Sequence, residues 1–369
     1  MGRPTQRKFV ARSAPLAAAV TTTSPAPVQI TNPFPVGDIV YESLNLRFAG
    51  AFTTTTGGGV VVTDGGLQFI RALYFSTPQH SMIVEGLDGI MLHDMQAIEE
   101  GHHPTHDDIA SVGAGDNPSY EYFLKLAFKD FLSYDIQDTG LDVQRSGQPL
   151  LQLNLGINTD FVSGGDTGDA VAATAILSSF LRMDPGRIDP ASEAPQNWMP
   201  YRGVLKVPIS ATVSQYQIYL AFGDRIIKRL YVTQRNGSSL ARLANTIIGA
   251  NDSDQISLKV NSNFPWFDRM EWLALQDANC SDYKLSAMPV GVGVIDFWQP
   301  VAGGSGDGRK GGQAGAKLAD ALSVISKDQG TLELDVDVTT VTNGQLWIGY
   351  DAVKVLPAGA RRPAPEPAK

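Results

Sequence analysis

The densest group of side chains able to bind a metal ion lies in one short run of the chain. All five histidines fall in the first third of the sequence, and residues 99–108 add several carboxylates. Imidazole and carboxylate groups suit zinc and similar ions. The candidate ligands are His102, His103, His106, Asp107 and Asp108. Gly101 and Pro104 indicate a loop rather than barrel strands with inward-pointing ligands, so we expect a solvated polar loop and no bound cofactor.

Other residue types that carry catalysis occur without the spacing that catalysis needs. Residues 303–310 are rich in glycine but lack the Gly-Lys-Ser/Thr end of a phosphate-binding loop. No Gly-x-Ser-x-Gly elbow lies at an expected strand-to-helix turn. Cys280 is the only cysteine, so no intramolecular disulfide can form, and its half of the chain contains no histidine. The sequence therefore predicts a protein that is not an enzyme.

The tryptophans favour two different interpretations. All five lie at or after residue 198, and Trp266 and Trp272 are close enough in sequence to line a sugar-binding strip. A carbohydrate-binding or receptor-binding β-sandwich, such as a spike or lectin, is therefore one hypothesis. Aromatic rings in β-domains more often fill a core or a subunit contact, and we favour that interpretation.

Only the two ends of the chain carry a net positive charge; at the C-terminal end, residues 357–369 contain Arg361, Arg362 and Lys369 against Glu366. The net charge is −9, although residues 1–36 carry four basic side chains and no acid. The basic side chains of this segment are Arg3, Arg7, Lys8 and Arg12. The acidic remainder argues against sequence-specific binding of nucleic acid. We expect residues 1–36 to form a flexible basic arm; a cleaved targeting peptide is the alternative.

Periodicity indicates that strands dominate the fold. Apolar and polar residues alternate in segments 44–52, 151–157, 256–260 and 332–338. Such strands bury one face and leave the other wet, as in an antiparallel sandwich. Segments 171–181, 204–213 and 291–298 are apolar on both faces, which predicts that a neighbouring sheet or subunit covers them. Only two short helices are predicted, over 87–100 and over 238–248, where Ser238 or Ser239 would be the N-cap.

One segment occurs twice. Residues 66–76, Gly-Leu-Gln-Phe-Ile-Arg-Ala-Leu-Tyr-Phe-Ser, return as residues 223–233, Gly-Asp-Arg-Ile-Ile-Lys-Arg-Leu-Tyr-Val-Thr. The two predicted helices follow the two copies at comparable places. The chain is therefore predicted to contain two copies of one fold.

Proline-rich residues 184–200 have little periodicity and form the expected junction between the copies. We predict an arm over 1–36, a first roll over 37–200, a second roll over 201–356 and a tail over 357–369. The predicted fold class is all-β, with two tandem eight-stranded antiparallel jelly rolls and a few short helices. The glycine-rich stretch 302–316 is expected to be a loop.

Two regions carry a resemblance to a known family. The strand over 41–52 followed by residues 65–73 resembles the N-terminal jelly roll of the corticovirus coat protein. Residues 331–338 followed by 344–351 resemble the end of its second roll. The chain is thus similar to the double jelly-roll major capsid proteins of tailless icosahedral bacteriophages with an internal membrane, the tectivirus and corticovirus kind. The glycine-rich stretch and the histidine-rich loop have no counterpart in this resemblance.

The resemblance implies a structural protein of the virion, made in the host cytoplasm. Three chains would form a pseudo-hexagonal capsomer, and neighbouring capsomers would tile an icosahedral shell. Other virion proteins, such as a vertex penton, would be further partners. The arm with Arg3, Arg7, Lys8 and Arg12 would face an internal lipid membrane.

Overall fold

The computed structural model describes two short strands near the N-terminus and most of the chain between residues 40 and 355. The described residues are 7–11, 27–30, 40–53, 59–104, 106–107, 113, 115–116, 118–128, 141–142, 147–160, 162–163, 170–175, 179–183, 198–222, 225–260, 264–297 and 331–355. The predicted junction over 184–200, apart from its last residues, and the predicted loop over 302–316 lie outside this part of the chain.

The chain divides into two compact units. Unit 1 comprises Met1–Gln96, Pro104–Pro200 and Val355–Lys369, and unit 2 comprises Ala97–His103 and Tyr201–Lys354. The boundary thus falls inside helix α2 (Gly89–Glu100). The domain limits at residues 36, 200 and 356 stay a prediction, while the segment Ala97–His103 is grouped with unit 2.

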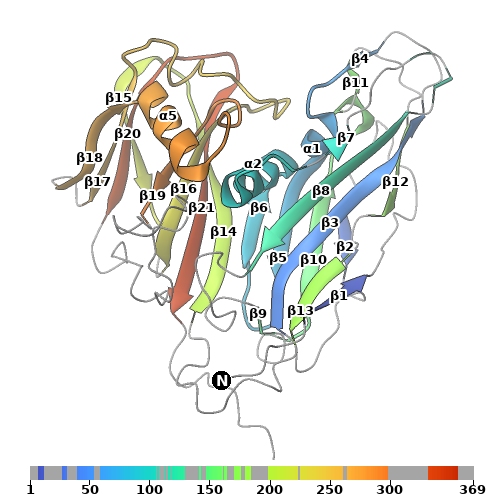
Figure 1. The fold of residues 1–369 in the computed structure, drawn as a ribbon. Coiled ribbons are helices and arrows are strands. Elements are labelled where there is room, and N and C mark those ends of the chain that lie inside the picture. Colours follow the sequence, from blue (N-terminus) through green and yellow to red (C-terminus); the bar gives the residue numbers. More distant parts are fainter. Residues whose placement is uncertain are drawn as a thin grey trace, which may run out of the picture. The chain divides into compact units, whose positions relative to one another are not determined.

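Unit 1 is built on antiparallel sheets (Figure 1). One sheet has seven strands in the order β1-β13-β3-β8-β7, with β12 and β9 also paired to β3. A second sheet runs in the order β6-β5-β10-β2, and β11 pairs with β4. The strands are β1 (Arg7–Ala11), β2 (Pro27–Ile30), β3 (Val40–Thr53), β4 (Val60–Val61), β5 (Ile70–Ser76), β6 (Val84–Leu87), β7 (His106–Asp107), β8 (Ser119–Ala127), β9 (Leu141–Asp142), β10 (Leu150–Leu155), β11 (Val162–Ser163), β12 (Ala170–Ala175) and β13 (Ser179–Met183).

Unit 2 also contains two antiparallel sheets. Their strand orders are β19-β16-β21-β14 and β15-β20-β17-β18. The strands are β14 (Trp198–Pro208), β15 (Val213–Leu220), β16 (Ile226–Asn236), β17 (Gln255–Val260), β18 (Phe264–Glu271), β19 (Val292–Asp296), β20 (Leu332–Val338) and β21 (Gly344–Val355). With strands as the main element and a few short helices, the predicted all-β class is confirmed.

The alternating segments form strands whose apolar residues lie in the core. In β3 the side chains of Leu44, Leu46 and Phe48 are buried while Arg47 is exposed, as a period of two requires. β10 alternates in the same way. Phe48 also packs between two further rings of the core, Phe69 and Tyr120, with centroid separations of 5.6 and 5.4 Å.

β20 differs from the expectation of a wet outer face. Glu333 and Asp335 are 2% and 4% exposed. β20 lies between β15 and β17, and groups of these two strands bind two of its carboxylates. Asp335 pairs with Lys259, and Asp337 accepts hydrogen bonds from the backbone N–H groups of Gln215 and Gln255 at 2.9 and 3.0 Å.

The expectation that all of residues 1–36 form a flexible arm is wrong for two segments. β1 pairs with β13, placing Phe9 opposite Leu181, and β2 pairs with β10. Phe9 and Val10 have high β-propensity, which the sequence interpretation passed over in favour of the neighbouring basic residues.

The described residues contain few helices. Of the two helices predicted from the sequence, only one is present. The helix predicted over 87–100 is α2, whose first turn is capped by the Asp88 carboxylate accepting a hydrogen bond from Met91 N–H at 2.7 Å. α1 (Gly65–Phe69), the 3-10 turn η1 (Asn158–Asp160) and α5 (Trp272–Tyr283) were not anticipated. No helix of the described part is long and apolar enough to cross a bilayer.

The helix predicted over 238–248 is absent, because side chains satisfy its backbone instead. The Asn236 carboxamide accepts hydrogen bonds from Ser238 N–H and Ser239 N–H, forming a turn rather than an N-cap. The Gln234 Oε1 atom accepts three more, from the N–H groups of Thr246, Ile247 and Ile248. Leu240 adopts a left-handed backbone conformation (φ 60°), which is incompatible with a continuous helix.

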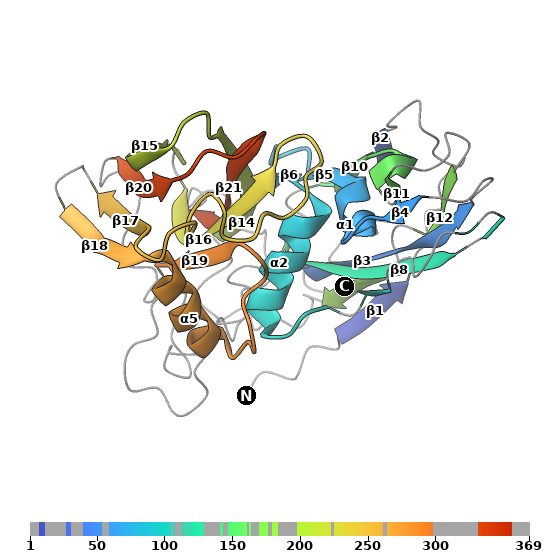
Figure 2. The same cartoon turned by 90° about the horizontal axis from the view of Figure 1, so that it is seen from above.

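α5 covers β19, the edge strand of its sheet (Figures 1 and 2). The Asn279 side chain donates to Val294 C=O at 3.0 Å and accepts from Val294 N–H at 2.8 Å. A carboxamide thus replaces the missing neighbouring strand, which protects an otherwise open edge.

The repeated segment contains a β-bulge at the same position in both copies. β5 shifts register against β10 so that Arg71 is the extra residue, and β16 shifts against β21 so that Lys228 is the extra residue. These two basic residues are aligned in the repeat. Each forms an ion pair with a buried acid, Arg71 with Asp160 and Lys228 with Asp351. Because bulges are retained within families, the shared bulge supports the predicted duplication.

Candidate functional site: a buried charge network in unit 2

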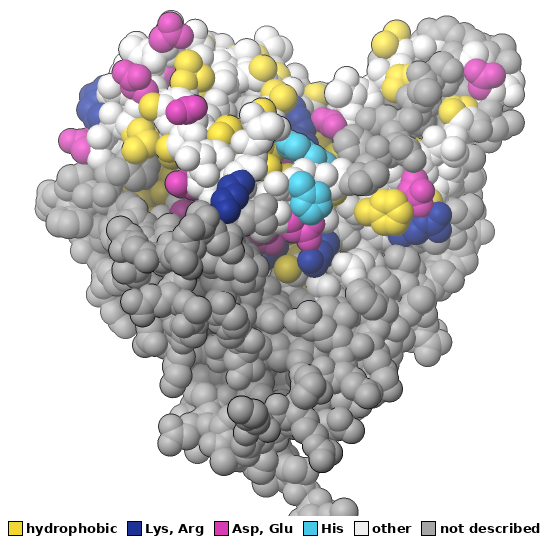
Figure 3. Space-filling model, viewed as in Figure 1, with side chains coloured by type: hydrophobic (Ala, Val, Ile, Leu, Met, Phe, Trp, Pro, Cys, Tyr) yellow, Lys and Arg dark blue, Asp and Glu magenta, His cyan; other side chains and the backbone are white. Residues whose placement is uncertain are grey.

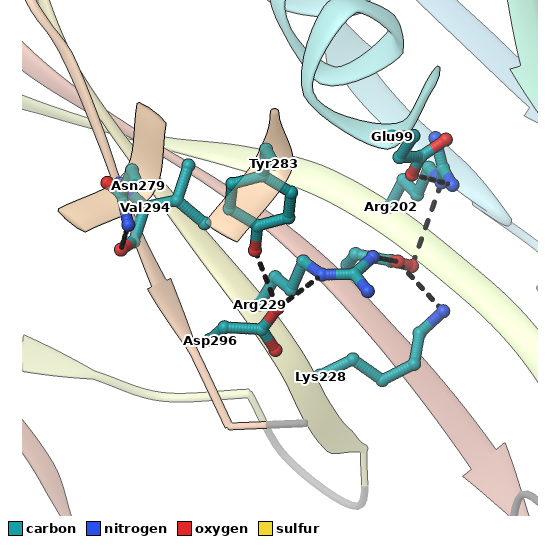
Figure 4. A network of polar contacts seen from close by, with 9 residues as sticks. Glu99, Arg202, Lys228, Arg229, Asn279, Tyr283, Val294 and Asp296 are labelled. Carbon is teal, nitrogen blue, oxygen red and sulfur yellow. Dashed lines mark hydrogen bonds and ion pairs between the residues drawn. The ribbon is translucent and has the colours of Figure 1, made fainter. Parts of the chain in front are cut away.

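Six charged side chains in the interior of unit 2 form one connected network (Figure 4). The members are Glu99, Arg202, Lys228, Arg229, Asp296 and Asp351. Their side chains are between 1% and 8% exposed, except for Asp296 at 23%. Three acids face three bases, so the formal charges cancel. Buried charges are tolerated in proteins only with this kind of compensation.

The bulge in β16 positions two of the bases. Successive side chains of a regular strand point to opposite faces, yet Lys228 and Arg229 both reach Asp351 of β21. The register shift after Ile227 places the two basic residues opposite this single acid. Lys228 Nζ lies 2.8 Å and Arg229 Nη1 3.7 Å from Asp351 Oδ2.

Glu99, in the last turn of α2, pairs with Arg202 of β14. Arg202 Nη2 donates a hydrogen bond to Glu99 Oε1, and Arg202 Nε lies 3.7 Å from Asp351 Oδ1. Arg202 therefore links the end of α2 to β21. The interaction fixes the C-terminal end of this helix within unit 2.

Asp296 extends the network to α5. Arg229 Nε donates to Asp296 Oδ2 at 3.0 Å, and the Tyr283 hydroxyl donates to the same oxygen at 2.6 Å. Burial, together with the charge of Asp296, raises the pKa of Tyr283. Tyr283 consequently stays protonated and remains a hydrogen-bond donor.

Burial sets the proton affinities at the other end of the network. It raises the pKa of Glu99, against the opposing charge of Arg202. Burial lowers the pKa of Arg202, but the charges of Glu99 and Asp351 outweigh it and the net shift is upward. Burial also raises the pKa of Tyr231, so this residue offers a neutral hydroxyl and no phenolate nucleophile. Because its groups are largely shielded from solvent, the network can join α2, β14, β16, β19 and β21 through ion pairs.

The predicted metal ligands are only partly within the described residues. His102 and His103 follow α2 and are exposed; Figure 3 shows histidine side chains on the surface. His102 Nε2 lies 3.6 Å from Glu100 Oε2. The backbone of His106 and Asp107 forms β7, but their side chains and all of Asp108 lie outside the described part. Across the described residues, no three His, Cys, Asp or Glu side chains are placed to hold a metal ion.

The remaining sequence candidates lie apart from the network. Arg7 and Lys8 belong to β1, whereas Arg3, Arg12 and the glycine-rich residues 303–310 fall outside the described residues. The idea that Trp272 helps to bind sugar is wrong, because its side chain is fully buried and its Nε1 donates to Asn245 Oδ1 at 2.9 Å. Packing at the start of α5 therefore takes up the ring surface that a sugar would need. The side chain of Trp266 is not described.

The sequence interpretation missed most of the network. Glu99 was noticed only as a neighbour of the histidines, and the charges of β16 and β21 were not interpreted as a site. A usable signal existed: Lys228-Arg229 and Asp351 are charges inside otherwise apolar strand segments. A charge in a strand that is buried on both faces predicts a buried partner.

Comparison with solved structures identifies proteins that share this fold. No protein-family description and no curated protein matches the sequence. Among solved structures, "Life in the extremes: atomic structure of Sulfolobus Turreted Icosahedral Virus" is 16% identical, with a TM-score of 0.61, over 96% of this chain and 95% of that chain. The chain has the double jelly-roll fold of viral major capsid proteins.

Two further matches show how widely this fold is shared. The "major capsid protein P2 from Bacteriophage PM2" is 12% identical, with a TM-score of 0.53, over 96% of this chain and 99% of that chain. The "Faustovirus major capsid protein" is 8% identical, with a TM-score of 0.57, over 96% and 91%. The predicted tandem jelly-roll architecture is therefore confirmed.

Replacing Glu99 by Gln should change how stability depends on pH. The folded-state pKa of Glu99 is raised, so its favourable contribution is complete below the unfolded-state pKa and is lost as pH rises through the folded-state value. As pH rises above the ordinary pKa of a glutamate, about 4.3, the native chain should therefore lose stability relative to Glu99→Gln. The difference is about 1.4 kcal/mol for each tenfold change in proton affinity.

Urea unfolding at several pH values measures this difference. Glu121→Gln, which removes a surface carboxylate paired with Arg47, is the matched control. A native chain that gains stability relative to Glu99→Gln as pH rises would contradict the assigned direction.

Proposed function

We propose that this chain is a viral major capsid protein. The single observation that carries the proposal is the shared fold along nearly the whole length of both chains with capsid proteins of several viruses. The solved structures that share the fold support a role in the capsid shell, and they lend no support to a spike or lectin. The buried network is compatible with this role, because its charged groups pair with one another inside unit 2.

Three chains would form a capsomer in which six similar rolls surround one axis. Two rolls in each chain allow a single gene product to occupy a nearly hexagonal lattice. Such ring-closing contacts need broad side-by-side surfaces rather than a cleft. The proposal includes neighbouring capsomers and a vertex protein as partners, the virion as location, synthesis in the host cytoplasm and no catalytic activity.

We expect the purified full chain to form trimers that associate further as concentration rises. Light scattering coupled to size-exclusion chromatography measures the mass at each concentration. A chain that stays monomeric at the highest soluble concentration would argue against the capsid role.

We also propose that the basic N-terminal residues contact the lipid membrane inside the particle. Arg3, Arg7, Lys8 and Arg12 are free of neighbouring acids in sequence. Near an anionic surface each basic residue contributes about 1 kcal/mol, or roughly a fivefold change in affinity. The backbone around Arg7 and Lys8 pairs with β13.

Changing these four residues to Ser should strongly weaken binding to vesicles that contain anionic lipid. The expected effect is largest at low salt, because salt screens exposed charges. Co-sedimentation with vesicles measures the binding. The matched control is Arg361→Ser with Arg362→Ser, which removes positive charge from the other terminus. Equal binding by the native and fourfold variant chains would refute the membrane contact while leaving the capsid role open.

A further inference from the structure

Two residues of the charge network and the neighbouring Tyr231 have buried polar atoms without a hydrogen-bond partner among the described residues. Arg202 Nε and Nη1, the Tyr231 hydroxyl and Asp351 Oδ1 are buried and have no hydrogen-bond partner among the described residues. The side chains of Arg202 and Asp351 are 6% and 1% exposed, and Tyr231 is fully buried. Nearly all buried polar groups of native proteins have a partner, either protein or ordered water. Several such atoms close to one network therefore require hydrogen-bond partners other than protein groups.

The separation of Arg202 and Asp351 is one that a single bridging atom can span. Arg202 Nε lies 3.7 Å from Asp351 Oδ1, which is beyond hydrogen-bonding range. A single oxygen atom placed to the side of this line can be at the usual distance of about 2.8 Å from both atoms. Polar contacts longer than about 3.5 Å are often completed by water in this way.

The chemistry of the orphaned atoms selects the ligand. Arg202 offers only donors, Asp351 offers only acceptors, and the Tyr231 hydroxyl offers one of each. An anion would satisfy Arg202 but be repelled by Asp351, and a cation would have the reverse difficulty. The six charges of the network already cancel, so an added ion would leave a buried net charge. A neutral molecule that both donates and accepts meets all of these requirements.

We infer that ordered water occupies the network of unit 2 and bridges Arg202, Tyr231 and Asp351. Internal water molecules typically make about three hydrogen bonds to buried polar groups that would otherwise be unsatisfied. Tyr231 follows Arg229 by two residues on β16, and Arg229 is directly opposite Asp351 on β21, so the three side chains lie on the same face of the sheet. A bridging water would let Asp351 interact with Arg202 while it also pairs with Lys228 and Arg229, with no change in the positions of the strands.

Tyr231→Phe tests the inference against a control with a known direct bond. If water binds the hydroxyl, the substitution removes a satisfied hydrogen bond and should lower the urea midpoint of unfolding. If the buried hydroxyl is unsatisfied, its removal should leave the midpoint unchanged or raise it, which would overturn the inference. Tyr283→Phe is the matched control: its hydroxyl donates directly to Asp296, so the midpoint must fall in either case.

A second measurement separates water from a direct contact that forms by side-chain movement. An experimental structure of the native chain, at a resolution that shows ordered solvent, should contain density within hydrogen-bonding distance of Tyr231 Oη and of Arg202 or Asp351. The density bound to the hydroxyl should be lost or displaced in Tyr231→Phe. A direct hydrogen bond from Tyr231 to a protein group, with no such density, would refute the proposed site even if the midpoint falls.

Discussion

Burying charge in a β-sandwich requires nearly complete local compensation, and this constraint shapes the interior of unit 2. Asp351 lies in a mainly apolar strand, and its buried charge is compensated by Arg202, Lys228 and Arg229. Two of these bases reach it through the bulge in β16. Removing one partner of such a network leaves an uncompensated buried charge, at a typical cost of about 3–5 kcal/mol. The strand register, the bulge and the end of α2 therefore depend on one another.

Unit 1 also contains a basic residue at a β-bulge that pairs with a buried acid, as unit 2 does. Arg71 is the extra residue of a bulge in β5, as Lys228 is in β16, and Asp160 takes the place of Asp351 as the acid partner. The acids come from different elements, the 3-10 turn in unit 1 and β21 in unit 2. The bulged base is thus the shared feature, and each unit supplies its own counter-charge. The shared bulge therefore supports the prediction that one module was duplicated and that its two copies diverged.

The sequence allowed prediction of those features that depend on local pattern. Alternation in β3 and β10 was enough to locate strands and their buried faces, and the apolar spacing in α2 was enough to locate a helix. Prediction failed where distant groups decide the outcome. Residues 238–248 resemble a capped helix, but the Gln234 side chain satisfies their backbone. α5 was missed because its buried stripe includes a polar residue, Asn279, whose role depends on the edge of β19. The charge network was equally hidden, since its members are more than 250 residues apart, from Glu99 to Asp351.

The central claim is that a two-roll chain with a rigid, charge-compensated interior serves as a repeating shell unit. Electron cryo-microscopy of particles that contain the native chain tests it most directly. The account predicts capsomers with six similar β-sandwich densities around one axis, contributed by three chains. Particles whose shell is built from another protein, with this chain absent from the lattice or present only as isolated projections, would contradict it.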